Sequence, residues 1–229
     1  MLATDEIAKR LREVRERIAQ SAMRAARAAE AIRLVLASKT QPADAIRAAY
    51  LAGARDFGEN YVQEAAAKRA ELEDLSKATW HLIGHLQTNK VPLATRTFDL
   101  IQTLDSARLA DAIARVRPSP PMRVMIEVNL AGEASKSGVA PDDVEPLIEA
   151  ARKKVEIAGL MTIPPPSESA AAARKYFAGL RALRDRLAGT SGLALSELSM
   201  GMTEDFEVAI EEGATMVRVG RAVFGERPK

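Results

Sequence analysis

Short apolar segments alternate with longer helical patterns along almost the whole chain, and this alternation limits the possible folds most strongly. Eight strands are expected, at residues 33–37, 54–58, 80–83, 100–104, 123–129, 155–161, 195–199 and 216–219. Helical patterning fills residues 42–52, 60–74, 87–95, 106–116, 141–153, 168–188 and 204–212. A parallel strand returns through a crossover, usually a helix. Eight such units favour a closed barrel over an open sheet.

A further helix is expected ahead of the first strand, over residues 5–29. Ile7, Leu11, Val14 and Ile18 recur there at helical spacing, and Thr4 can cap its start. The proline-rich segments 118–121 and 164–166 are expected to be loops, because composition does not change across either. We therefore predict an α/β fold, a single (β/α)8 TIM barrel over residues 1–229 with an additional N-terminal helix.

Composition narrows the class of protein. The chain has 229 residues, 47% of them hydrophobic, which is enough for a large core. Its net charge of +2 comes from interleaved acidic and basic residues, which does not favour nucleic-acid binding. No cysteine is present, so disulfides and thiolate chemistry are excluded. With no signal-peptide pattern and no apolar run of about 20 residues, we expect a cytoplasmic protein that does not enter membranes.

Polar and small residues gather where the predicted strands end, as an active or binding site on a barrel requires. Two of these ends suit a phosphate. Ser199 and Gly201 follow the seventh strand, and Gly220 and Arg221 follow the eighth. Barrels of this kind commonly bind phosphate with these two loops and a helix N-terminus. Either pair alone could serve only a tight turn, but together they favour a phosphate site.

The first strand ends in a lysine, Lys39, that can reach this phosphate site. A lysine acts as a nucleophile only as the neutral amine, which burial beside other cations favours. The first strand neighbours the eighth when the barrel closes, so Lys39 could reach an aldehyde whose phosphate is held there. Lys136 is the competing lysine, but it follows the fifth strand and lies farther round the rim.

Other chemistries match the sequence poorly. His81 and His85 are the only histidines, and their spacing is not that of a zinc-protease helix. No dinucleotide or nucleoside-triphosphate glycine motif is present. We expect His81 to be a packed strand residue, whereas His85 could line the pocket.

The segments at the strand ends resemble a known family in order and spacing. Residues 80–90, WHLIGHLQTNK, are similar to the signature of the YggS/PROSC-type pyridoxal phosphate homeostasis proteins. The segments 38–40 (SKT), 57–60 (FGEN), 199–202 (SMGM) and 218–220 (RVG) match it too. The resemblance covers residues 33–226. Leu82 stands where a bulkier residue is commoner, and Arg221 where threonine is frequent.

The resemblance implies a barrel like the N-terminal domain of alanine racemase, with pyridoxal 5'-phosphate (PLP) as cofactor. It implies that Lys39 carries the cofactor as an internal aldimine and that Arg218 faces the pyridine nitrogen. Asn60 would line the ring pocket. The phosphate would be held by Ser199, Gly201, Gly220 and Arg221; the departure at Arg221 still leaves a backbone amide there.

These residues predict a cofactor carrier more than an efficient enzyme. Arg218 is a permanent cation, which disfavours protonation of the ring nitrogen and weakens the ring as an electron sink. A racemase also needs a second base, which alanine racemases take from another domain that we expect this chain to lack. The expected role is PLP and vitamin B6 homeostasis, with PLP-dependent apoenzymes as possible recipients and no metal.

Three alternatives stay open on sequence alone. The first is a weak amino-acid racemase that uses Lys39. The second is a sugar-phosphate isomerase with Glu59 as its carboxylate base. The third is an RNA-binding or interaction role of the arginine-rich first helix, which rests on charge alone.

Overall fold

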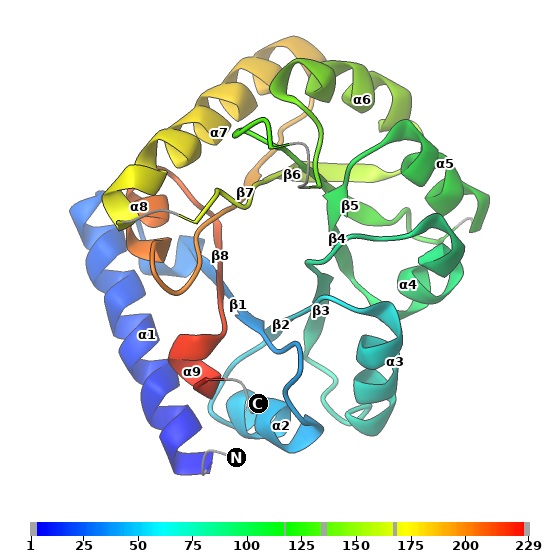
Figure 1. Ribbon diagram of the computed structural model, residues 1–229. Helices are drawn as coiled ribbons and strands as arrows, with labels where there is room; N and C mark the ends of the chain where they lie inside the picture. Colours follow the sequence, from blue (N-terminus) through cyan, green and yellow to red (C-terminus); the bar gives the residue numbers. More distant parts are fainter. Residues whose placement is uncertain (1–3, 117, 134–136, 167–168, 227–229) are drawn as a thin grey trace.

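The strands form a closed parallel barrel surrounded by helices (Figure 1). The computed structural model describes residues 4–116, 118–133, 137–166 and 169–226. Strand order follows the chain from β1 to β8, and β8 pairs back onto β1. The strands are β1 (Arg33–Ala37), β2 (Asp56–Glu59), β3 (Thr79–Leu82), β4 (Leu100–Leu104), β5 (Arg123–Glu127), β6 (Glu156–Met161), β7 (Glu197–Ser199) and β8 (Met216–Val219). The predicted (β/α)8 barrel is confirmed.

The helices fill the expected positions, mostly with shorter bounds than predicted. They are α1 (Thr4–Arg24), α2 (Ala43–Leu51), α3 (Val62–Glu71), α4 (Val91–Thr97), α5 (Ala107–Val116), α6 (Val144–Ala151), α7 (Ala170–Ser191), α8 (Phe206–Glu211) and α9 (Arg221–Phe224). Short 3-10 turns at Ala29–Ala31, Thr88–Lys90 and Pro141–Asp143 occupy parts of the predicted helical ranges. Ser169 caps α7 by accepting a hydrogen bond from the Ala172 amide, and Gly192 ends it at a φ of 70°.

The first helix differs from its prediction at both ends. Thr4, expected to be a cap, is already its first residue. The expected continuation to residue 29 is wrong, because the helix ends at Arg24 and Ala26 turns to a φ of 52°. None of the helices within the described residues has the length and apolar character needed to span a bilayer.

α1 closes the outside of the barrel against α8, α9 and α2. Leu11 is fully buried in this contact. Three of the five α1 arginines contact other elements of the fold: Arg17 pairs with Glu207 at 3.1 Å, Arg24 with Glu211 at 3.1 Å, and Arg15 donates to the Gly53 carbonyl at 2.7 Å. The charge that suggested a separate interaction role for this helix is therefore largely engaged in folding.

Side chains inside the barrel alternate with those that pack under the helices. A small inner cluster contains Val35, Leu100, Met125, Met161 and Met216, and the large outer cluster joins the strands to the helices. Residues two positions along a strand from these inner residues also face the barrel axis. That set includes the polar side chains of Gln102, Glu127 and Arg218, of which Arg218 lines the candidate site.

Candidate functional site

A cavity of about 680 Å³ opens at the carboxyl ends of the strands. Five of the seven residues predicted for the site line it: Lys39, Asn60, Arg218, Gly220 and Arg221. The loop after β7 adds Met202, Thr203, Glu204 and Asp205. The predicted pair Ser199 and Gly201 is not part of its lining and lies next to it, at the end of β7.

Lys39 follows β1 in a tight turn that neighbouring side chains hold in place. The Gln41 amide donates to the Ser38 carbonyl at 2.9 Å, and Thr40 adopts a φ of 66°. The Thr40 amide donates to Glu64 Oε1 at 2.7 Å, and Lys68 Nζ donates to the Ser38 carbonyl at 2.9 Å. These bonds on both sides of Lys39 present its half-buried side chain to the cavity.

Glu59, the base of the isomerase alternative, faces away from the main cavity. It follows Gly58 at the end of β2 and is fully buried under α3. Its Oε1 accepts from Ser38 Oγ at 2.7 Å and from Lys68 Nζ at 2.9 Å. Burial raises the pKa of Glu59, and the Lys68 ammonium opposes that rise. The carboxyl thus fixes the Lys39 turn and is not available as a base beside the phosphate loops.

Arg218 is the most buried cation at the mouth, with 3% of its surface exposed. It donates through Nη1 to Ser199 Oγ at 2.6 Å and through Nη2 to the Thr162 carbonyl at 2.8 Å. Burial lowers the pKa of Arg218 to about 10, while the charges of Glu127 and Asp205 act in the opposite direction. It therefore stays protonated at neutral pH, and a guanidinium has five N–H donors, more than these two bonds use.

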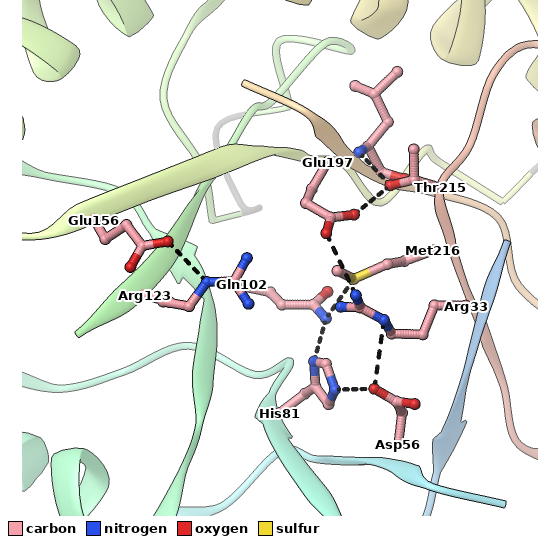
Figure 2. Close-up of polar contacts among 10 residues, drawn as sticks. Arg33, Asp56, His81, Gln102, Arg123, Glu156, Glu197, Thr215 and Met216 are labelled. Carbon is pink, nitrogen blue, oxygen red and sulfur yellow. Dashed lines mark hydrogen bonds and ion pairs between the residues drawn. The ribbon is translucent and has the colours of Figure 1, made fainter. Parts of the chain in front are cut away.

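A chain of hydrogen bonds continues from Arg218 down through the barrel. Ser199 Oγ donates to Gln102 Oε1 at 2.6 Å, and Gln102 Nε2 lies 3.1 Å from His81 Nδ1. His81 Nε2 lies 3.0 Å from Asp56 Oδ1, as Figure 2 shows. Because an amide nitrogen only donates, His81 Nδ1 accepts and its proton sits on Nε2. Each group in this series therefore donates its hydrogen bond to the next one, starting at Arg218 and ending at the Asp56 carboxylate.

The far end of this chain meets charged residues at the amino ends of the strands. Arg33 lies 3.7 Å from Asp56 and 3.5 Å from Glu197, between the two carboxylates (Figure 2). His81 is fully buried, as expected for a packed strand residue. The barrel interior therefore fixes the Arg218 guanidinium through side chains from β7, β4, β3 and β2.

Two glycines shape the loops after β7 and β8. Gly201 has a φ of 90°, and a Cβ on it would lie 2.5 Å from Ala209 Cβ. Gly220 brings the end of β8 close to β1, since a Cβ there would lie 3.0 Å from the Ala37 carbonyl oxygen. Gly220 also precedes α9, and its carbonyl accepts from the Val223 and Phe224 amides. The Arg221 and Ala222 amides at the start of α9 are left without an acceptor inside the helix. These are the loops in which the sequence predicts a phosphate site.

Acidic side chains also line the mouth and are largely engaged. Arg221 Nη2 donates to Glu204 Oε1 at 3.0 Å. Asp205 Oδ1 accepts from the Met202 amide at 2.6 Å, and burial raises the pKa of Asp205. Arg221 thus closes one side of the rim through a surface ion pair, with its backbone at the start of α9.

The two further candidates of the sequence lie elsewhere. His85 does not line the main cavity; its Nδ1 lies 3.1 Å from Asp105 Oδ2, and it lines two neighbouring cavities, one of which shares Asn60, Ile83 and Ile163 with the main one. Lys136, the competing lysine, lies outside the described residues.

Sequence reasoning missed two buried residues that shape the site, Gln102 and Glu127. Both occupy inward positions: Gln102 is two residues after Leu100, and Glu127 two after Met125. A count of every second residue from the apolar inner positions would have found them. The partners of Gln102 could not have been found that way, because Ser199 lies 97 residues away.

Comparison with known proteins places this site in a family. The family model for the N-terminal domain of alanine racemase matches residues 5–228. A pyridoxal phosphate homeostasis protein of Pseudomonas aeruginosa is 45% identical over 225 residues, covering 96% of both chains. One of Aquifex aeolicus is 46% identical over 222 residues, covering 95% of this chain and 97% of its own.

A solved structure agrees in fold over nearly the full length. PipY of Synechococcus elongatus PCC7942, with PLP bound, is 39% identical and superposes with a TM-score of 0.84. The match covers 96% of this chain and 100% of that one. The fold and site thus define a barrel of the alanine racemase N-terminal type. Within that class, the chain belongs to the family of the pyridoxal phosphate homeostasis proteins.

Proposed function

We propose that this chain binds pyridoxal 5'-phosphate at the barrel mouth and acts in PLP homeostasis, as a carrier without efficient catalysis. The observation that carries the proposal is the meeting of Lys39, Arg218 and Gly220 in one cavity. The names of the relatives and the PLP-bound state of PipY support it.

The residues at the mouth fit this cofactor. A cavity of about 680 Å³ is in the range of small-molecule sites. Lys39, Arg218 and Arg221 supply positive charge for a phosphorylated ligand. A Cβ at Gly220 would lie 3.0 Å from the Ala37 carbonyl oxygen, so glycine suits this close approach. The Arg221 and Ala222 amides that follow it open α9, where a helix start favours an anion.

Each residue has a distinct part in this proposal. Lys39 provides the amine that holds the aldehyde carbon, Asn60 lines the ring pocket, and Arg218 presents N–H groups to the ring nitrogen. The backbone after Gly201 and Gly220, including Arg221, binds the phosphate. Ser199, whose hydroxyl is already bonded to Gln102 and Arg218, fixes Arg218. When bound, PLP supplies an electrophilic aldehyde and an electron-withdrawing ring.

Arg218 is also the reason that we expect poor catalysis. A protonated guanidinium cannot accept the proton of a pyridinium, so the ring nitrogen beside it stays unprotonated. That weakens electron withdrawal from a bound amino compound.

We propose that PLP-dependent apoenzymes of the cytoplasm receive the cofactor.

The alternative of a weak racemase is tested by proton exchange. Holo-protein incubated with L-amino acids in deuterated buffer should exchange the α-proton slowly and yield little of the other enantiomer. Racemisation near the median enzyme turnover of about 10 s⁻¹ would replace the carrier proposal by the racemase.

Binding itself is tested by thermal unfolding with PLP and with pyridoxal, which lacks the phosphate. At a hundredfold excess over its Kd, PLP should add about 2.7 kcal/mol to the free energy of unfolding. Pyridoxal at the same concentration should add much less, because the charge-assisted bonds to the phosphate are missing. Equal shifts would place the phosphate outside the loops after β7 and β8, and no shift with either would refute PLP binding.

A further inference from the structure

A second cavity beside the main one contains a buried carboxyl group that the proposed cofactor site does not use. Glu127 ends β5 two residues after Met125, whose side chain belongs to the inner cluster of the barrel. Because side chains alternate along a strand, Glu127 also points toward the barrel axis, at its carboxyl-end mouth. Only 6% of its surface is exposed, and its Oε2 has no hydrogen-bond partner.

An unpartnered carboxyl oxygen at this depth is an acceptor that a ligand can use. A buried polar atom without a partner costs about 1–3 kcal/mol, so folded proteins satisfy nearly all of them. Glu59 Oε2 is also unpartnered, but Glu59 has Ser38 and Lys68 on its other oxygen. Glu127 instead lines an open cavity of about 330 Å³.

The walls of this cavity favour a small ligand with a cationic hydrogen-bond donor. Asn60, His85, Asn129 and Ser137 line it with polar side chains, while Ile83 and Ile163 offer apolar contacts for a short carbon chain. Asn60, Ile83 and Ile163 also line the main cavity, so both open on the same mouth.

The charges around Glu127 agree with a cation. Asp105, after β4, lies near it and pairs with His85, after β3, at 3.1 Å. The positive charge of Arg218, on β8, lowers the pKa of the Glu127 carboxyl. Burial first, and then the charge of Asp105, raise the pKa of Glu127 to about 7, against the opposing effect of Arg218. A positive ligand would relieve both causes of this rise.

Metal coordination is not favoured. Among the described residues, no group of three or more histidine or carboxylate side chains could hold a metal ion. A primary ammonium group instead needs one carboxylate and a few neutral acceptors for its three N–H donors.

We propose that the cavity beside Glu127 binds the primary ammonium group of a small amino compound, with Glu127 as its carboxylate partner. The ligand would lie next to the main cavity and share its walls at Asn60, Ile83 and Ile163. The site consists of protein groups alone, so it does not depend on the proposed binding of PLP.

The test follows the Glu127 carboxyl carbon by ¹³C NMR in the full chain with labelled glutamate and no added PLP. The Glu127 signal is assigned by its absence in Glu127→Gln, and Glu127→Asp provides a second assignment should Glu127→Gln fold poorly. Methylammonium chloride is titrated against sodium chloride at constant ionic strength. At tenfold excess over its Kd, methylammonium should lower the midpoint of the Glu127 titration by about one pH unit.

Two controls decide the outcome. Tetramethylammonium chloride has the same charge but no N–H donors, so it should leave the midpoint unchanged, and the exposed Glu73 should not respond to either salt. Equal effects of both ammonium salts would mean a general ionic effect and would overturn the proposal. An unchanged midpoint with methylammonium would mean that the cavity holds only water, and would also overturn it. Neither outcome bears on PLP binding, which the thermal-shift comparison measures separately.

Discussion

At the scale of single residues, Gly201 shows how strictly the loop after β7 is specified. Its φ of 90° suits glycine, and an added Cβ would lie 2.9 Å from Phe206 Cα and 2.5 Å from Ala209 Cβ. α8 would therefore have to move away from the loop, and that loop lines the proposed cofactor cavity. The residue acts on the site through the backbone without touching the cavity.

We expect Gly201→Ala to lower the free energy of unfolding by about 2–4 kcal/mol, combining backbone strain with overpacking. Urea denaturation measures this directly. Gly189→Ala is the matched control: Gly189 lies inside α7 with no atom within 4 Å of an added Cβ, so helix propensity should make that change neutral or stabilising. Equal effects of the two substitutions would show that the loop is not constrained as described.

Glu127 makes a residue-scale prediction about pH. Its folded-state pKa of about 7 is raised from an ordinary value of 4.5. A group of this kind stabilises the fold while protonated, and that contribution is lost as the pH rises through 7. The loss is on the order of 3 kcal/mol between pH 4.5 and pH 8.

Glu127→Gln removes this titration, so its free energy of unfolding relative to wild type should rise by about 3 kcal/mol between pH 5 and pH 8. Denaturation curves at the two pH values measure the change. The exposed Glu73→Gln should show no such difference. A constant gap between wild type and Glu127→Gln would mean that the carboxyl is not buried as the structure places it.

At the scale of secondary-structure elements, the hydrogen-bond chain joins strands that are distant in sequence. Gln102 on β4 connects Ser199 on β7 with His81 on β3, and Ser199 in turn holds Arg218 on β8. The chain replaces apolar packing in this part of the barrel interior. Its value lies in fixing a buried guanidinium that would otherwise be costly to bury.

Gln102→Leu should therefore destabilise the fold by about 2–5 kcal/mol, since it leaves the Ser199 hydroxyl and His81 Nδ1 buried without their amide partner. Urea denaturation of this variant is compared with Gln63→Leu, the same change at an exposed position of α3. The control should stay within about 0.5 kcal/mol of wild type. A similarly small effect of Gln102→Leu would show that the chain of bonds contributes little.

Most elements could be predicted from the sequence because apolar periodicity is a local signal. The bounds of β1, β4 and β8 agree with prediction, and the other strands differ by one or two residues at one end or, for β2 and β3, at both. α1 was predicted too long because no glycine or proline marks its end, and alanine residues continue past Arg24. The turn at Ala26 is a helix end in which the Arg27 amide bonds to the Ala22 carbonyl and the Ala26 amide to the Met23 carbonyl, with alanine where glycine usually marks such an end.

The site was predictable to the extent that strand order fixes its neighbours. Lys39 and Gly220 meet because β1 pairs with β8, which follows from closing an eight-stranded barrel. The hydroxyl of Ser199 was expected at the phosphate but is bonded to Gln102 and Arg218. These bonds join side chains from three different strands, so they could not be predicted from the sequence before the fold was known.

At the scale of the whole molecule, the two ends of the barrel differ in the side chains that they carry. The amino ends of the strands carry a charged layer in which Arg33 lies between Asp56 and Glu197. The carboxyl ends carry the cavities, with loops shaped by glycine and a lysine held in a tight turn. A series of hydrogen bonds links the two ends through Arg218, Ser199, Gln102 and His81. The proposed cofactor would therefore contact a guanidinium that the barrel interior holds in place.

The central claim is that this mouth holds PLP on Lys39, and borohydride reduction followed by peptide mapping tests it most directly. Reduction makes the bond between a lysine amine and the cofactor aldehyde permanent, so the modified peptide identifies the lysine. We expect the label on the peptide that contains Lys39, and we expect it to be lost from that peptide in Lys39→Arg. A label on another lysine, such as Lys136, with Lys39 unmodified, would show that Lys39 does not hold the cofactor.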